Sequence, residues 1–416
     1  MSCRFLESLS LSTLVAPTTD EDFRALYWER QPLIIHRENP DYYDNLFTLQ
    51  EFDEAILRSS DYVKMANAAT NKFAAYKGAM TEGLEAALGD MRAGGTIVLD
   101  QLHNREPKLS RLCRVLASEL GHRFQTNLYL TPSNGKGFSP HWDNHDVFIL
   151  QVVGSKHWKI EQRRRTYPAK DEPMDDKGRE LRGDLHSFTI EQGDVVYIPR
   201  GFVHAAECGA EPSLHITLGV VGEHWDDLVY VAVRAAILQN EQLRHTLPLG
   251  FNRSPDDLVN RLKGVFRELA DVSFLRGAVE QYLDEMVSRY PLDVSNQVVD
   301  FFHPKPLGLN NLVGARSGIV FRMHVADDSV RVNYGARTIT FPYFFREALE
   351  FSLHRPVFAI GDIPGDLQDQ EKIVFVERLL EEGLVVRRDG AQPGQPDGTD
   401  RPHHEHLAES SPAVAD

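Results

Sequence analysis

The segment 139–154, SPHWDNHDVFILQVVG, carries the strongest structural signal in the chain. It places His141 and Asp143 two residues apart, shortly before the apolar run VFILQVVG. Side chains alternate between the two faces of a strand, so this spacing predicts that both side chains point to the same face. Further along, the segment 193–207, GDVVYIPRGFVHAAE, has another apolar strand, a turn and then His204. Together the two segments predict a β-rich domain that brings three polar side chains together.

Short apolar strands separated by turns fill the surrounding sequence from 125 to 221. The turns include TPSNG, GS, GD and PRG, whose residues favour tight turns. Strands at this density predict a sandwich or barrel of the jelly-roll type, so the expected fold class is mainly β with flanking helices. The segment 163–183 interrupts the strands with charged residues and shows no periodicity. It is expected to be an exposed loop.

The sequence before the β region has mainly helical patterns. The first ninety residues look helical with polar connections, and helices are predicted at 19–30 and 49–58. The segment Leu33-Ile34-Ile35 between them reads as a short strand. The segment GGTIVLDQL then reads as a strand bounded by glycines, and the apolar spacing of 107–120 predicts another helix.

Three regions are predicted after the β region. The segment 223–290 contains three consecutive amphipathic helices, which predict a small bundle or a dimerisation element. Two of their apolar faces are predicted to include Trp225, Val229 and Leu262. Short strands then mix with two helices, the pattern of a winged-helix-like module. The tail PGQPDGTDRPHHEHLAESSPAVAD is expected to be disordered because its composition cannot bury a core. The predicted regions are 1–222, 223–290, 291–388 and 389–416.

Composition limits the partners of this protein. The chain has 416 residues and a formal net charge of −16, which argues against general binding to nucleic acid or anionic membranes and suits a basic protein or peptide. The segment 291–388 has no excess of basic residues, so DNA binding is not expected. The three cysteines, Cys3, Cys113 and Cys208, are widely spaced, and no long apolar run is present. We therefore expect a cytoplasmic protein with reduced thiols and no membrane span.

His141, Asp143 and His204 are candidate metal ligands. Two histidines and one carboxylate on one side of a metal leave open coordination positions, and this set is typical of non-haem Fe(II) oxygenases. An HxD pair by itself occurs by chance; the following strand, the turn and the later histidine make metal binding the favoured reading. His145 and His215 are expected to pack nearby or orient the site rather than bind metal.

Lys156 is a candidate for binding an anionic cosubstrate. It follows the Gly154-Ser155 turn, so it can begin the adjacent strand and project inward, where a buried lysine needs an anionic partner. A dicarboxylate would provide one, and an exposed turn lysine is the alternative. Further hydroxyl and amide donors could come from three side chains, for which a packing role is the alternative on spacing alone: Asn127, Tyr129 and Thr217.

These segments resemble a known family. The segments 124–158, FQTNLYLTPSNGKGFSPHWDNHDVFILQVVGSKHW, 193–207 and SLHITLG are similar to the JmjC-type ribosomal oxygenases of the cupin superfamily. The resemblance extends to YWERQPLII near the N-terminus, LRHTLPLGF after the β region and FVERLLEEGLVV near residue 380. It covers about residues 10 to 388.

The resemblance implies a fold and an activity. The fold would be a double-stranded β-helix (jelly-roll) JmjC barrel, followed by a helical dimerisation domain and a winged-helix-like domain. The activity would be that of an Fe(II)- and 2-oxoglutarate-dependent dioxygenase, which uses O2 to hydroxylate an arginine or histidine side chain in a basic protein, such as a ribosomal protein. The chain would be a homodimer.

The resemblance also implies residue roles. Iron would be held, and the catalytic centre formed, by His141, Asp143 and His204. The distal carboxylate of 2-oxoglutarate would pair with Lys156, assisted by Tyr129, Asn127 and Thr217.

Other functions remain open from the residues alone. The substrate could be a biosynthetic peptide or a free amino acid, or the barrel could be a non-catalytic scaffold. The bulk of Trp142 between two candidate ligands and the segment 163–183 could each direct the site to a different peptide.

Overall fold

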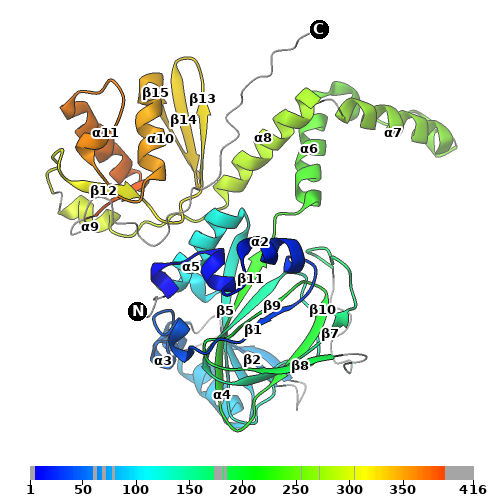
Figure 1. Cartoon of the computed structure of the whole chain (residues 1–416). Helices are drawn as coiled ribbons and strands as arrows, with labels where there is room; N and C mark the ends of the chain where they lie inside the picture. The colour runs from blue at the N-terminus through cyan, green and yellow to red at the C-terminus, as the bar shows by residue number, and fades with distance from the viewer. Residues whose placement is uncertain are drawn as a thin grey trace.

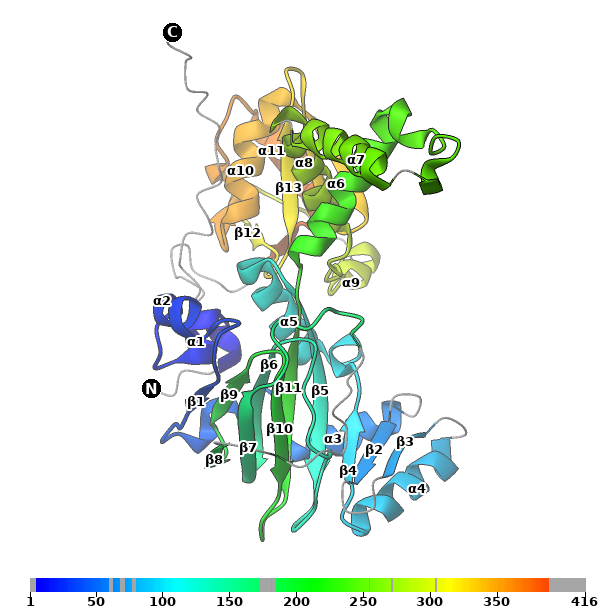
Figure 2. The same cartoon turned by 90° about the vertical axis from the view of Figure 1, so that its right-hand side faces the viewer.

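The computed structural model describes residues 5–388, apart from 60–62, 68–71, 77–79, 173–180, 182–184, 254, 271 and 304. A β-rich barrel carries the N-terminal half of the chain, a helical arm leaves it, and a mixed α/β unit follows (Figures 1 and 2). The tail predicted to be disordered, 389–416, lies outside the described residues.

Two sheets face each other in the barrel, as the strand pattern predicts. The large sheet has eight strands, in the order β1-β9-β6-β11-β5-β4-β2-β3, and the small sheet has three, in the order β10-β7-β8. The strands of the large sheet are β1 (Leu33–Ile35), β2 (Val63–Asn67), β3 (Lys72–Tyr76), β4 (Thr96–Leu99), β5 (Arg123–Thr131), β6 (Val147–Gly154), β9 (Val195–Ile198) and β11 (Ser213–Val221). Those of the small sheet are β7 (Lys156–Arg163), β8 (Leu185–Ile190) and β10 (Phe202–Glu207).

Strand β6 is buried on both faces, which explains its unbroken apolar sequence. Val147 and Ile149 point between the two sheets, whereas Phe148 and Leu150 pack against the outer helices. The apolar cluster inside the barrel contains Val147, Ile149, Trp158, Ile160, Ile190, Val196, Ile198 and Phe202. This dry layer closes one side of the barrel interior.

The outer face of the large sheet is covered by helices. They are α1 (Leu11–Val15), α2 (Asp20–Asp22), α3 (Leu49–Arg58), α4 (Met80–Arg92) and α5 (Pro107–Leu120). The predictions for α3 and α5 match the observed bounds. The short strand expected at 33–35 is β1. Two other predictions were wrong: the helix expected at 19–30 is the single turn α2 followed by a π-helical turn at 23–27, and the first ninety residues also contribute β2 and β3 to the large sheet.

The helical arm contains α6 (Trp225–Gln239), α7 (Pro255–Leu269) and α8 (Val272–Ser288), as predicted. Part of its apolar faces is not buried within the chain, however. The exposed fraction is 82% for Trp225, 56% for Val229 and 54% for Leu262. No helix among the described residues is both long enough and apolar enough to span a bilayer.

The C-terminal unit has its own apolar core, which includes Val332, Leu349 and Phe375. It contains two three-stranded sheets, β16-β12-β17 and β13-β14-β15. The strands are β12 (Leu312–Ala315), β13 (Phe321–Val325), β14 (Ser329–Tyr334), β15 (Arg337–Pro342), β16 (Phe358–Ala359) and β17 (Val385–Arg387). The helices are α9 (Gln297–Phe302), α10 (Arg346–His354) and α11 (Asp369–Glu381).

Candidate metal centre

His141, Asp143 and His204 converge inside the barrel. Each offers a ligand atom, and these three atoms lie within 4.8 Å of one another. His204 lies on β10, on the same face as Phe202, which belongs to the cluster between the sheets. The loop that carries His141 pairs with this strand: His204 N donates to His141 O at 2.8 Å, and His141 N donates to His204 O at 3.2 Å.

The HxD motif does not lie in a regular strand, contrary to the prediction. His141 forms an isolated bridge with His204, and β6 begins only at Val147. The motif is aligned by hydrogen bonds to β10 and its preceding turn, where Gly201 N donates to Asp143 O at 2.9 Å. The three side chains therefore come together because the His141–Asp143 loop pairs with β10. The alternation of side chains along a single strand does not bring them together.

Both histidines are oriented to bind metal through Nε2. His141 Nδ1 lies 2.8 Å from Ser139 O, and His204 Nδ1 lies 3.1 Å from Phe202 O. A carbonyl oxygen only accepts hydrogen bonds, so each Nδ1 carries the proton and each Nε2 keeps its lone pair. Metal-binding histidines are usually fixed in this way. The donor set and its orientation fit Fe(II).

The charge states also suit a metal ion. Burial lowers the pKa of His204 to about 4, so this imidazole is neutral at physiological pH. Burial would raise the pKa of Asp143, but the nearby His141 and His204 outweigh it and hold the pKa below its ordinary value. Asp143 Oδ2 lies 3.6 Å from His204 Nε2. The Asp143 carboxylate and the neutral His204 imidazole thus face a common point with His141.

Lys156 is buried at the start of β7, as predicted. Only 3% of the residue is exposed, and its Nζ donates to Thr131 Oγ1 at 2.9 Å. Burial lowers its pKa from 10.5 to about 8. Within the described residues, no carboxylate forms an ion pair with it. A lysine in this environment is a strong site for an anion.

A glycine turn places Lys156 in this position. Gly154 has φ +66°, and a Cβ on it would lie 2.0 Å from Pro212 O. Only glycine satisfies both constraints. The turn reverses the chain from β6 to β7, so that Lys156 and Trp158 both face the interior.

Asn127, Tyr129 and Thr217 lie on the face of the large sheet that points into the barrel. Asn127 and Tyr129 are on β5, and Thr217 is on the neighbouring strand β11. Asn127 pairs with Thr217, and Tyr129 pairs with His215, in the β5-β11 ladder. Thr217 also pairs with Ile149 of the inner cluster. Burial raises the pKa of Tyr129, so its phenol is protonated. The structure thus brings these three side chains to one wall.

Two further residues complete this wall. Thr131 accepts the Lys156 hydrogen bond and was missed, although it continues the period of two from Asn127 and Tyr129. His215 is 2% exposed and stacks on Tyr129, with ring centroids 4.9 Å apart and 2° between the planes. It therefore packs beside the site, as predicted. Trp142 is buried, with 3% exposed.

Comparisons with known proteins support these observations. The JmjC domain model matches residues 99–228. Ribosomal oxygenase 1 of Gallus gallus is 30% identical over 293 residues, which cover 64% of this chain and 49% of that protein. A bifunctional lysine-specific demethylase and histidyl-hydroxylase NO66 of Aedes aegypti is 27% identical over 434 residues, 90% of this chain and 66% of that protein. The chain thus spans half to two thirds of these relatives.

A solved structure shares the fold. It is the Escherichia coli ribosomal oxygenase YcfD in complex with cobalt and 2-oxoglutarate, with a TM-score of 0.55 and 16% identity, and the match covers 89% of this chain and 99% of that chain. The jelly-roll JmjC fold expected from the sequence is therefore confirmed.

Proposed function

We propose that this chain, a JmjC-domain protein related to the ribosomal oxygenases, is an Fe(II)- and 2-oxoglutarate-dependent dioxygenase that hydroxylates an arginine or histidine side chain of a protein. One observation carries the proposal: three oriented metal ligands, His141, Asp143 and His204, share the barrel interior with Lys156, a buried cation that no described carboxylate neutralises.

Each residue has a defined role in this proposal. His141, Asp143 and His204 would hold Fe(II) on one side and leave positions for 2-oxoglutarate and O2. Lys156 would neutralise the distal carboxylate of 2-oxoglutarate, with hydrogen bonds from Tyr129. The two remaining donors assigned to this cosubstrate are Asn127 and Thr217.

The chain supplies orientation and a dry environment. When bound, iron, 2-oxoglutarate and O2 supply the oxidising power that hydroxylates a C–H bond. Trp158 packs 6.0 Å from the His204 ring and 5.7 Å from the His215 ring, between centroids, and it belongs to the apolar cluster that excludes water from this side. Low polarity there strengthens the attraction of Lys156 for a carboxylate.

A ribosomal protein is the proposed substrate. Ribosomal proteins are basic, and a chain with a net charge of −16 attracts them electrostatically. The relatives described above, a ribosomal oxygenase and a histidyl-hydroxylase, support the same substrate class.

Turnover of 2-oxoglutarate without substrate tests the activity. We expect wild-type protein with Fe(II) and ascorbate to form succinate slowly, and we expect His141→Ala and Asp143→Ala to reduce this rate at least about 100-fold, since each removes a metal ligand. Succinate is measured by NMR. If the wild type forms no succinate, even with ribosomal proteins present, the barrel is a scaffold and the proposal fails.

We also propose that the regions 1–222, 223–290 and 291–388 are the JmjC, dimerisation and winged-helix-like domains. Separate apolar cores in the barrel and the C-terminal unit support these boundaries. Helices α9, α10 and α11, together with the sheet β13-β14-β15, support the winged-helix-like assignment.

A cytoplasmic location is also proposed. It is supported by two buried free thiols, Cys113 and Cys208.

The helical arm is proposed to form a homodimer. Its exposed apolar side chains include Trp225 at 82%, Tyr230 at 70% and Phe266 at 58%, more than a monomer usually leaves in contact with water. We expect wild-type protein to have the mass of a dimer in size-exclusion chromatography with light scattering, and Leu262→Glu to have half that mass. Asn260→Glu, on the polar side of α7, is the control and should remain dimeric. An equal mass for wild type and Leu262→Glu would reject this interface.

A further inference from the structure

Six aromatic rings form a closed circuit inside the barrel, and the circuit includes two of the metal ligands. Each ring lies between 4.6 and 6.0 Å from the next, measured between centroids. In order, the rings are those of His141, His204, Trp158, His215, Tyr129 and Phe138. The exposed fraction is 5% for His204, 5% for Trp158 and 2% for His215, whereas the other three residues are half-buried. The circuit therefore has a buried side and a more exposed side.

Two ring nitrogens on the buried side have no hydrogen-bond partner in the part of the chain that the structure describes. They are Trp158 Nε1 and His215 Nδ1. An indole N–H can only donate, and an imidazole nitrogen can donate or accept. A buried donor without an acceptor is destabilising, and folded proteins rarely keep one. An acceptor from outside the chain would satisfy both atoms.

Lys156 places a positive charge beside these two nitrogens. Its Nζ lies 6.0 Å from the centroid of the Trp158 ring and donates to Thr131 Oγ1 at 2.9 Å. Thr131 follows Tyr129 by two residues on β5, and Tyr129 pairs with His215 on β11. Two residues of a strand span about 7 Å. The ammonium group and the two aromatic side chains therefore meet in one small region of the barrel.

The His215 ring is held in place and carries no charge. It stacks on Tyr129, with 4.9 Å between centroids and 2° between planes, and it meets the Trp158 ring at 74°. Burial, and then the positive charge of Lys156, hold the pKa of His215 well below its ordinary value. The neutral imidazole adds no second positive charge next to the ammonium group. An anion at Nδ1 favours the tautomer with the proton on that nitrogen.

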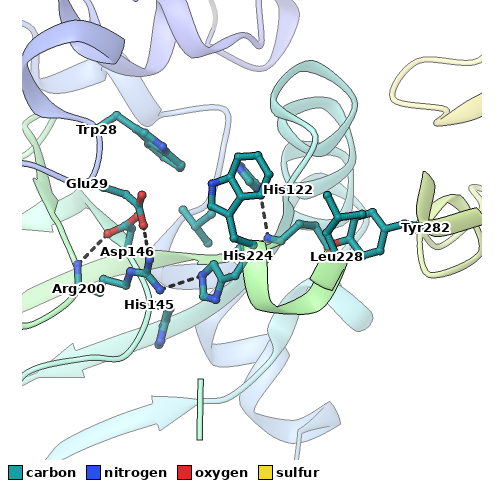
Figure 3. A pocket seen from close by; sticks show the side chains of 13 residues that line it. Trp28, Glu29, His122, His145, Asp146, Arg200, His224, Leu228 and Tyr282 are labelled. Atoms are coloured by element: carbon teal, nitrogen blue, oxygen red, sulfur yellow. Dashed lines mark hydrogen bonds and ion pairs between the residues drawn. The ribbon is translucent and has the colours of Figure 1, made fainter. Parts of the chain in front are cut away.

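The cavity of about 370 Å³ between the barrel and the helical arm does not offer this combination. Its charged groups already have partners: Glu29 Oε1 lies 2.6 Å from Arg200 Nη2 (Figure 3). Likewise, Glu223 Oε2 lies 3.3 Å from Arg289 Nη1. The barrel interior differs because Lys156 has no carboxylate partner among the described residues.

We propose that His215 and Trp158 bind the distal carboxylate of 2-oxoglutarate, as two neutral hydrogen-bond donors beside Lys156. The identity of the anion rests on the proposed function. Lys156 would supply the charge, but an ammonium group on a flexible stem neutralises a carboxylate over a range of positions. The two ring N–H groups are held by packing and would fix one position. They would therefore determine the specificity for a dicarboxylate of this length.

His215→Phe and Trp158→Phe test the two donors. Each variant keeps an aromatic ring in the circuit and removes one N–H group. We expect each to weaken 2-oxoglutarate binding to the Co(II)-loaded protein about tenfold or more, since a hydrogen bond to a charged group is lost. Titration calorimetry measures this, and Co(II) affinity should stay within a few-fold of wild type.

His157→Phe and Trp28→Phe are the matched controls. His157 points outward on β7, where its ring nitrogens lie 3.1 Å from Thr189 Oγ1 and Ser187 Oγ. Trp28 stacks on Tyr197 in the apolar cluster outside the barrel. Both controls should bind 2-oxoglutarate like the wild type.

A matched ligand identifies the carboxylate that is bound. 2-Oxopentanoate has the same five-carbon chain, with a methyl group in place of the distal carboxylate. Its binding is followed through the visible absorption of Co(II). It should bind the wild type more weakly than 2-oxoglutarate does, and neither His215→Phe nor Trp158→Phe should weaken it further. An equal loss for both ligands would place the N–H groups away from the distal carboxylate and overturn the proposal.

The same titrations separate this inference from the proposed function. Wild-type protein that binds Co(II) but not 2-oxoglutarate would reject the dioxygenase. Wild-type protein that binds 2-oxoglutarate, with unchanged affinity in both His215→Phe and Trp158→Phe, would reject only the two donors. If one variant alone keeps its affinity, the residue changed in that variant does not contact the carboxylate.

Discussion

His204→Ala is expected to abolish tight metal binding. The imidazole is buried, its Nδ1 is fixed by Phe202 O, and its Nε2 faces Asp143. Among the described residues, no fourth His, Cys, Asp or Glu joins this group of ligand atoms. Loss of even an indirect partner of a ligand typically lowers metal affinity 10- to 100-fold, so loss of the ligand itself should lower the affinity more than about 100-fold. Titration with Co(II), followed by its visible absorption, measures this directly and needs no turnover.

His157→Ala is the matched control. His157 lies on β7 but points outward, where its ring nitrogens lie 3.1 Å from Thr189 Oγ1 and Ser187 Oγ. This variant should bind Co(II) like the wild type, and circular dichroism should show that both variants are folded. Co(II) binding by folded His204→Ala with unchanged affinity would remove this residue from the metal site.

The sequence was sufficient to select the three candidate metal ligands that the structure brings together, because their signal is local chemistry. An HxD pair before an apolar strand, and a histidine after a proline turn, are residue types whose spacing limits where they can lie. The geometry that unites them is not local. His141 meets His204 through two backbone hydrogen bonds between segments distant in sequence, and a pattern of period two cannot reveal that pairing.

The errors of sequence reasoning have the same origin. β2 and β3 add to the edge of the large sheet by long-range pairing, although they lie in a region with helical neighbours. The helices of the arm were predicted correctly, but the periodicity of Leu262 or Val229 cannot tell whether the apolar face is covered by the same chain or by a second one. Contacts between segments distant in sequence decide both whether a segment such as β2 joins a sheet and what covers an apolar helix face.

Lys156 should control cosubstrate affinity. Lys156→Met replaces a buried ammonium by an apolar side chain of similar size. Removal of one partner from a buried charge pair costs about 3–5 kcal/mol, so 2-oxoglutarate should bind to the Co(II)-loaded protein about 100-fold more weakly or worse. Calorimetry measures this, and Co(II) affinity should stay within a few-fold of wild type.

Lys159→Met is the control for this variant. Lys159 lies three residues further along β7 on the outer face, where its Nζ is 3.3 Å from Glu207 Oε1. Its replacement should leave 2-oxoglutarate affinity unchanged. If Lys156→Met binds 2-oxoglutarate as tightly as Lys159→Met, then Lys156 does not contact the cosubstrate.

Because of the lowered pKa of Lys156, folding stability and 2-oxoglutarate affinity should respond to pH in opposite directions. Folding lowers this pKa from 10.5 to about 8, so between these values the unfolded chain binds more protons and the unliganded protein gains stability as pH rises. Binding of 2-oxoglutarate needs the ammonium form, so its affinity should be constant below about pH 8 and fall up to about tenfold per unit above it. Lys156→Met should lose both effects, because it removes the titrating group. A wild-type affinity that stays flat between pH 7 and 10 would show that the bound carboxylate does not depend on this charge.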